Sequence, residues 1–181
     1  ALGRFSATEV RLDRAAGPFV LLALEGLDRP AVHAAAARGD LGALAASADA
    51  LEARCRFGWT ALHHAAWQGH GAAVSWLLDR GVGLGRANDG CTALHVAAAA
   101  GRDAVVAQLL PLHPDVAAPD RAGRTPLHWA SERGHLAAAN RLLAAGAPVE
   151  ARDARGRTPL FWAAQRGHAG LVRALLSSGA G

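Results

Sequence analysis

The chain has 181 residues, of which 51% are apolar and 19% are charged, and its formal net charge is +4. This balance is typical of a globular chain and excludes a disordered one. No apolar stretch approaches the roughly 20 residues that would cross a bilayer, so we expect no membrane insertion. One domain, or one array of repeats, is expected for this length.

Residues 1–27 fit no repeat, and we expect an N-terminal extension that packs on the first repeat. Residues 19–24 are apolar and follow Gly17 and Pro18, which break the segment. They resemble the core of a secretory signal peptide, but Glu25 follows them without a small-residue cleavage site. We therefore predict an intracellular protein, in the cytoplasm, the nucleus or both. Because the sequence contains no Met, we also expect the chain to be part of a longer protein.

From Pro30 onward the chain is repetitive. Matching strings read TALHHAAWQGH from Thr60, TALHVAAAAGR from Thr92, TPLHWASERGH from Thr125 and TPLFWAAQRGH from Thr158, in steps of 32, 33 and 33 residues. A weaker match, PAVHAAAARGD, starts at Pro30, 30 residues before Thr60. The period and the Thr-Pro-Leu-His signature resemble the ankyrin repeat family.

The resemblance implies an all-α fold, an ankyrin-like solenoid of stacked helix-turn-helix repeats with projecting turns. It covers residues 28–181, divided into about five repeats at 28–56, 57–88, 89–121, 122–154 and 155–181, and the first repeat is expected to act as a cap. Each unit also makes physical sense by itself. Thr125 is a good N-cap, Pro126 fits the first helical position, and Gly134 permits the left-handed backbone that ends the helix. A single unit cannot bury its apolar face, so stacking is required.

The nine histidines are expected to be structural. His33, His63, His95 and His128 occupy the histidine position of the signature, where the family uses this side chain to brace the adjoining turn. His70, His135 and His168 follow the glycine that ends the first helix, and only His64 and His113 fall outside the pattern. Because adjacent residues of a helix point to different faces, His63 and His64 do not form a pair of ligands. We expect no metal site.

Catalysis is not expected either. Cys55 and Cys91 are too few for a disulfide framework, and no histidine is placed to activate Cys91. The sequence lacks a phosphate-binding loop, a dinucleotide fingerprint and a nucleophile elbow. We therefore predict a protein that is not an enzyme and needs no cofactor.

The resemblance places partner-binding residues on the turn tips and on the exposed end of each first helix, which together line a concave face. In the second repeat this face would carry aromatic residues, and in the fourth and fifth repeats it would carry arginines. The expected partner-binding residues are Phe57, Trp59, Trp67, Arg121, Arg124, Arg133, Arg155, Arg157 and Arg166. Exposed aromatic residues and arginines are the types that most often anchor protein interfaces.

The charge is also uneven along the chain. Residues 1–118 hold 10 arginines and 11 acidic residues, whereas residues 119–181 hold 9 arginines and 4 acidic residues. We therefore predict a protein-interaction module, a scaffold or adaptor, whose partner is a protein with an acidic segment and an apolar anchor. The alternative is binding of nucleic acid or another polyanion through the C-terminal arginines. The interspersed acidic residues and the lack of a basic recognition helix make nucleic acid the less favoured partner.

Overall fold

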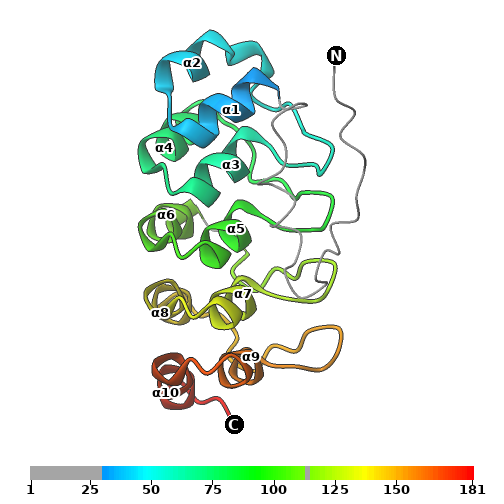
Figure 1. Cartoon of the computed structure of the whole chain (residues 1–181), viewed down its shortest axis with the longest axis vertical. Coiled ribbons are helices and arrows are strands. Elements are labelled where there is room, and N and C mark those ends of the chain that lie inside the picture. The colour runs from blue at the N-terminus through cyan, green and yellow to red at the C-terminus, as the bar shows by residue number, and fades with distance from the viewer. Residues whose placement is uncertain (1–29, 113–114) are drawn as a thin grey trace, which may run out of the picture.

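The computed structural model describes residues 30–112 and 115–181, and within these ranges all regular structure is helical. The predicted extension at residues 1–27 and His113 lie outside the described residues. The all-α solenoid expected from the sequence is confirmed (Figure 1). The first helices of the repeats are α1 (Ala31–Arg38), α3 (Ala61–Gln68), α5 (Ala93–Ala99), α7 (Pro126–Arg133) and α9 (Pro159–Gln165). The second helices are α2 (Leu41–Ala46), α4 (Gly71–Asp79), α6 (Asp103–Leu109), α8 (Leu136–Ala144) and α10 (Ala169–Ser177), and short 3-10 turns, η3 (Ala48–Ala50) and η4 (Leu110–Leu112), follow α2 and α6.

The helices form two rows, which we call the inner row (α1, α3, α5, α7, α9) and the outer row (α2, α4, α6, α8, α10). Each helix packs on its partner in the same repeat and on the neighbouring helices of its own row, and the turns project from the inner row to one side (Figure 1). The main core lies between the rows. It consists of buried alanines with a few larger apolar side chains from each repeat, such as Leu62, Leu94 and Leu127, so the helices can approach closely.

A histidine joins each of the three central repeats to the next one. In the third repeat the Thr92 N–H donates to Nδ1 of His95 at 3.1 Å, while Nε2 of His95 donates to the Arg124 carbonyl of the following turn at 3.1 Å. Because Nε2 carries the proton and Nδ1 accepts, the ring is the neutral tautomer. His63 and His128 make the corresponding pairs of bonds. The bracing role that the resemblance implied is therefore visible at these positions.

A second histidine, present in the second, fourth and fifth repeats as His70, His135 and His168, explains why glycine ends the inner helix of the preceding repeat. Gly134 has a φ of +79°, which glycine adopts without strain. A Cβ atom at Gly134 would lie 2.6 Å from the ring of His168, whose Nε2 donates to the Glu132 carbonyl. The glycine therefore supplies both the left-handed turn and the space in which the next repeat docks.

The buried histidines predict a stability that depends on pH. Burial lowers the pKa of His63 and of His95 to about 4, whereas an unfolded histidine titrates near pH 6.5. Their stabilisation is complete above pH 6.5 and is lost as the pH falls to about 4, by on the order of 3 kcal/mol for each ring. Urea unfolding at pH 7.5, 6.0, 5.0 and 4.5 should therefore show a falling free energy of unfolding. Equal free energies at pH 7.5 and pH 5.0 would contradict this account.

Candidate functional site

The aromatic part of the expected binding face is smaller than the sequence suggested. Trp59 is only 2% exposed, which corrects the expectation that its ring faces a partner. Its carbonyl accepts a bond from the Cys55 N–H, and this closes the turn so that the indole packs beneath it, in a second apolar cluster with Cys91 and Trp129. Trp67 meets the Trp59 ring edge-on at 6.4 Å and is half-buried.

Phe57 is the other half-buried aromatic residue of this region, and it packs against the same cluster as Trp67. The Arg56 guanidinium lies 4.9 Å from the centre of its ring. Both aromatic side chains therefore present part of their surface to solvent while the remainder is fixed in the cluster. They are the remaining aromatic candidates on this face.

The turns of the fourth and fifth repeats are held by one aspartate each. Asp120 accepts bonds from the Arg124 N–H at 2.8 Å and from Nε1 of Trp129 at 3.0 Å. Asp153 has the same role in the next turn, where it accepts from the Arg157 N–H at 3.0 Å and from Nε1 of Trp162 at 3.2 Å. Each turn is thus tied to the helix that follows it.

These aspartates and tryptophans also fix two arginines. The Arg124 guanidinium lies 3.6 Å from the centre of the Trp129 ring, and the Arg157 guanidinium lies 4.1 Å from that of Trp162 and forms an ion pair with Asp153 at 2.8 Å. Burial alone would raise the pKa of Asp153, but its bonds from Arg157, Arg155 and Trp162 outweigh this effect and lower the pKa to about 2. The carboxylate therefore stays charged at neutral pH, and both arginines are held in defined positions.

Four of the predicted arginines line one cleft between the last two repeats. The cleft has a volume of about 300 Å³. Its walls are Ala122, Arg124, Glu132, Arg155, Arg157, Trp162 and Arg166. We call it the arginine cleft. Arg121, also predicted, is exposed on the adjoining turn, and Arg133 is half-buried at the end of α7. The sequence prediction thus brought together residues that meet in space at the C-terminal end of the array.

Glu132 is the residue that the sequence analysis undervalued. It is 6% exposed and bridges two arginines, with its carboxylate oxygens 2.9 Å from Arg124 and 2.9 Å from Arg166. Asp120 and Asp153, which the sequence prediction did not single out, are also buried. The signal that could have found the aspartates is the shared pattern Asp-x-x-Gly-Arg-Thr in the last two repeats, at 120–125 and 153–158. The carboxylates of Asp120, Glu132 and Asp153 therefore neutralise part of the positive charge of the six arginines predicted to bind a partner.

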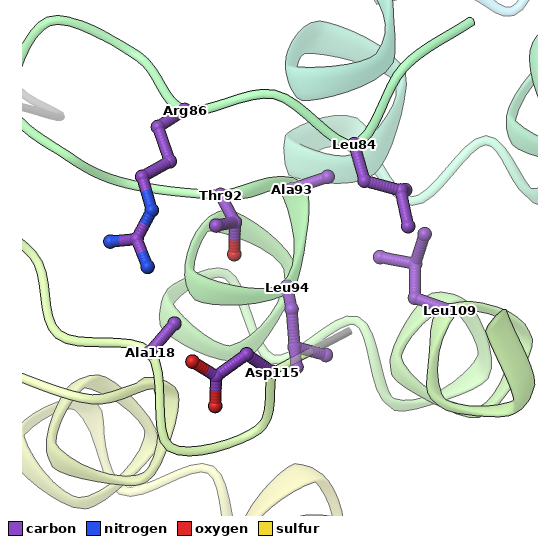
Figure 2. Close-up of a pocket in the computed structure, with 8 residues that line it drawn as sticks. All are labelled: Leu84, Arg86, Thr92, Ala93, Leu94, Leu109, Asp115 and Ala118. Carbon is purple, nitrogen blue, oxygen red and sulfur yellow. The ribbon is translucent and has the colours of Figure 1, made fainter. Parts of the chain in front are cut away.

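A second pocket, of about 210 Å³, lies between the end of the second repeat and the third repeat, beside the start of α5. Leu84, Leu94 and Leu109 form its apolar wall, and Arg86 and Asp115 reach toward it from the loops (Figure 2). It has one charge of each sign and an apolar floor. It therefore lacks the concentration of like charge that distinguishes the arginine cleft.

The described residues offer little for covalent catalysis. Both cysteines are buried and unbridged. Burial, together with the nearby carboxylates of Asp89 and Asp120, raises the pKa of the Cys91 thiol far above its usual range, so it stays protonated.

One group of described residues could hold a metal ion, namely His33, Cys55 and His64 in the first two repeats, well away from the arginine cleft. Within the described ranges, no helix has the length and apolar character that a bilayer span requires.

Comparison with known proteins agrees with the repeat architecture. A family model described as ankyrin repeats (3 copies) matches residues 32–120 and again residues 105–181. The two matches together extend over nearly all of the described chain. No curated protein matches the sequence.

The bridge made by Glu132 predicts a specific loss of stability. Glu132→Gln keeps the size of the side chain but removes the charge that holds Arg124 and Arg166. Since hydrogen bonds to charged, buried groups are the strong ones, we expect the free energy of unfolding to fall by about 1–3 kcal/mol in urea titration. The control is Asp103→Asn, which disrupts an ion pair with Arg141 whose partners are 42% and 47% exposed. That change should be below about 0.5 kcal/mol, and equal losses in the two variants would contradict the role given to Glu132.

Proposed function

The chain belongs to the ankyrin repeat family, and we propose that it is a non-enzymatic scaffold or adaptor that binds an acidic segment of another protein in the arginine cleft. Ankyrin repeats are generally protein-protein interaction modules. The observation that carries the proposal is the convergence of Arg124, Arg155, Arg157 and Arg166 on one cleft. A carboxylate is the natural partner of a guanidinium, because the two planar groups can form two parallel hydrogen bonds.

The rigidity of the cleft supports a peptide as its ligand. Arg124 and Arg157 are already stacked on indole rings and paired with acidic residues. Binding therefore costs less side-chain entropy than it would with mobile arginines. The fixed positions also favour ligands whose carboxylates have a matching spacing.

The buried acidic residues favour an acidic peptide over nucleic acid. Asp120, Glu132 and Asp153 lie among the arginines and leave this face with a modest positive charge. A nucleic-acid backbone presents closely spaced phosphates and rewards a continuous row of cations. An acidic protein segment, in which carboxylates alternate with other side chains, suits the interrupted pattern better.

The aromatic residues of the second repeat supply the proposed apolar anchor. Phe57 and Trp67 are half-buried and lie on the same face as the turns. Partner-binding residues in this proposal are Phe57, Trp67, Arg121, Arg124, Arg133, Arg155, Arg157 and Arg166. Trp59 acts behind them as a support because its ring is covered.

Charge reversal tests the electrostatic half of the proposal. Peptides would be selected from a random display library with the wild-type chain, and we expect them to be rich in Asp and Glu. The variant Arg121→Glu with Arg155→Glu changes two exposed side chains that are not stacked on tryptophan, so the fold should be retained. Association of the selected peptides at low salt should slow by roughly 10-fold or more in surface plasmon resonance.

The matched control is Arg141→Glu with Arg173→Glu, which makes the same charge change on the exposed surface of α8 and α10. Its association rate should stay within about twofold of the wild type, because the altered charges lie on the outer row. Equal slowing by both variants would contradict a local site. Binding of a generic DNA duplex with a steep salt dependence, together with no enrichment of acidic peptides, would favour the polyanion alternative instead.

A tryptophan substitution tests the aromatic half. Trp67→Ala should weaken binding of the selected peptides by about 2 kcal/mol, the loss typical of an interface anchor, as measured by isothermal titration calorimetry. Trp76→Ala is the control, because Trp76 is also half-buried but lies on the outer helix α4, where Arg80 covers its ring at 3.5 Å. An unchanged affinity in Trp67→Ala would remove the aromatic anchor and leave the arginine cleft as the whole site.

A further inference from the structure

Two histidines and a cysteine meet between the first two repeats. One ligand atom from each of His33, Cys55 and His64 lies within 4.8 Å of the other two. The three residues are 0%, 7% and 3% exposed, and they come from α1, from the turn at the end of the first repeat and from α3. Imidazole nitrogens and a thiolate are the ligand types that bind soft and borderline transition metals.

The repeat register shows that Cys55 and His64 form a substituted pair. In every turn the first of these positions donates its N–H to the carbonyl four residues later, and the second position lies nine residues on, in the next inner helix. The pairs are Cys55 and His64, Ala87 and Val96, Asp120 and Trp129, and Asp153 and Trp162. The last two pairs are hydrogen-bonded to each other. The repeat backbone therefore directs these two side chains toward one another, and among the four pairs only Cys55 and His64 place a metal-ligating group at both positions.

His33 differs from the corresponding histidines of the next three repeats. Nδ1 of His63, His95 and His128 accepts a bond from the threonine N–H that caps its helix. At His33 the capping position is Pro30, which has neither a backbone N–H nor a hydroxyl. The ring is therefore not engaged by a threonine cap and reaches the other two side chains instead.

The tautomer of His33 suits a ligand. Its Nε2 donates to the Ala53 carbonyl at 2.8 Å, so the lone pair belongs to Nδ1. A metal-bound histidine in proteins commonly donates its other ring N–H to a backbone carbonyl, which fixes both the tautomer and the ring orientation. The Ala53 carbonyl lies in the turn that also carries Cys55, so one short segment would both orient His33 and supply Cys55 as a ligand.

We propose that His33, Cys55 and His64 bind one Cu⁺ ion. A thiolate, two neutral imidazoles and a monovalent ion together carry no net charge, which matters because an uncompensated charge is costly in a buried site. Zn²⁺ at the same ligands would leave a net positive charge, and structural zinc prefers four ligands, whereas the described cluster offers three. Copper enters as Cu⁺ and stays Cu⁺, and the thiol proton passes to solvent as the Cu–S bond forms.

The geometry needs only a small adjustment. Ligand atoms that share one ion at bond lengths of about 2.0–2.3 Å lie roughly 3.3–3.9 Å apart. Rotations that move the side-chain tips by about 1 Å would bring the cluster from its present separation to this one. The bound ion would link the first repeat to the second through His33 of α1. This is the helix whose capping position holds Pro30 in place of a threonine.

The test is anaerobic titration of the full chain with Cu⁺ buffered by the chelator bicinchoninate, in the presence of a reductant. Wild-type protein should withdraw one equivalent from the chelator. Cys55→Ala and His64→Val install the residues that the chain carries at the next equivalent pair of positions, Ala87 and Val96, so both variants should fold, as checked by circular dichroism. Each should bind Cu⁺ more than ~100-fold more weakly, because even loss of an outer partner of a metal site costs about 10–100-fold. The control Cys91→Ala removes the other buried thiol and should keep the full affinity.

The remaining outcomes are equally decisive. Undiminished Cu⁺ binding in folded Cys55→Ala would overturn the site, as would failure of the wild-type chain to compete with the chelator. Preferential retention of Zn²⁺ when both ions are offered would overturn the assignment to a monovalent ion. A rise in the melting temperature of wild-type protein and of Cys91→Ala with added Cu⁺, but not of Cys55→Ala, would support the proposal, since a ligand that binds only the folded state stabilises it.

Discussion

The array depends on a neutral imidazole that is hydrogen-bonded on both sides. In the three central repeats one ring nitrogen accepts from the cap of its own helix, and the other donates to the turn of the next repeat. A protonated ring could not accept at Nδ1, and a side chain with one polar atom could not make both bonds. The last repeat shows the difference, because Phe161 at this position is 44% exposed and has no ring nitrogen, so the Thr158 hydroxyl accepts from the Phe161 N–H without an imidazole partner. One side chain thus sets the helix start and the repeat spacing together.

Much of this fold could be predicted from the sequence because each repeat encodes its own boundaries. Threonine caps, the proline at the first helical position and the helix-ending glycines appear where the strings placed them. The candidate site was harder to predict. Trp59 looked exposed because it sits on a turn, but the turn's own hydrogen bond folds it inward. In the sequence Glu132 is a single acidic residue among arginines. Its burial depends on Arg124, 8 residues before it, and on Arg166, 34 residues after it. Such contacts depend on how repeats stack, which single-repeat patterns do not contain.

The positive charge of the C-terminal repeats is organised rather than diffuse. Each turn combines an aspartate, an arginine and a tryptophan so that the indole N–H and the guanidinium both reach the same carboxylate. The tryptophan face then covers the arginine from below. The residue count gives an excess of arginine over acidic residues in this part of the chain. The structure shows that some of these arginines form ion pairs within the protein. What remains for a partner is a small number of guanidinium groups in fixed positions.

The backbone bond that closes each turn has a consequence for how such a chain can diversify. It joins an N–H to a carbonyl four residues later, and it forms whether the first residue is cysteine, alanine or aspartate. Cysteine and alanine at that point leave the closing of the loop to this backbone bond, whereas Asp120 and Asp153 add side-chain bonds to the turn and to the tryptophan that each one faces. The residues at these paired positions can therefore differ between repeats while the backbone of the repeat stays the same. Different repeats of one protein can then carry unrelated chemistries, acquired one substitution at a time, without refolding the units on either side.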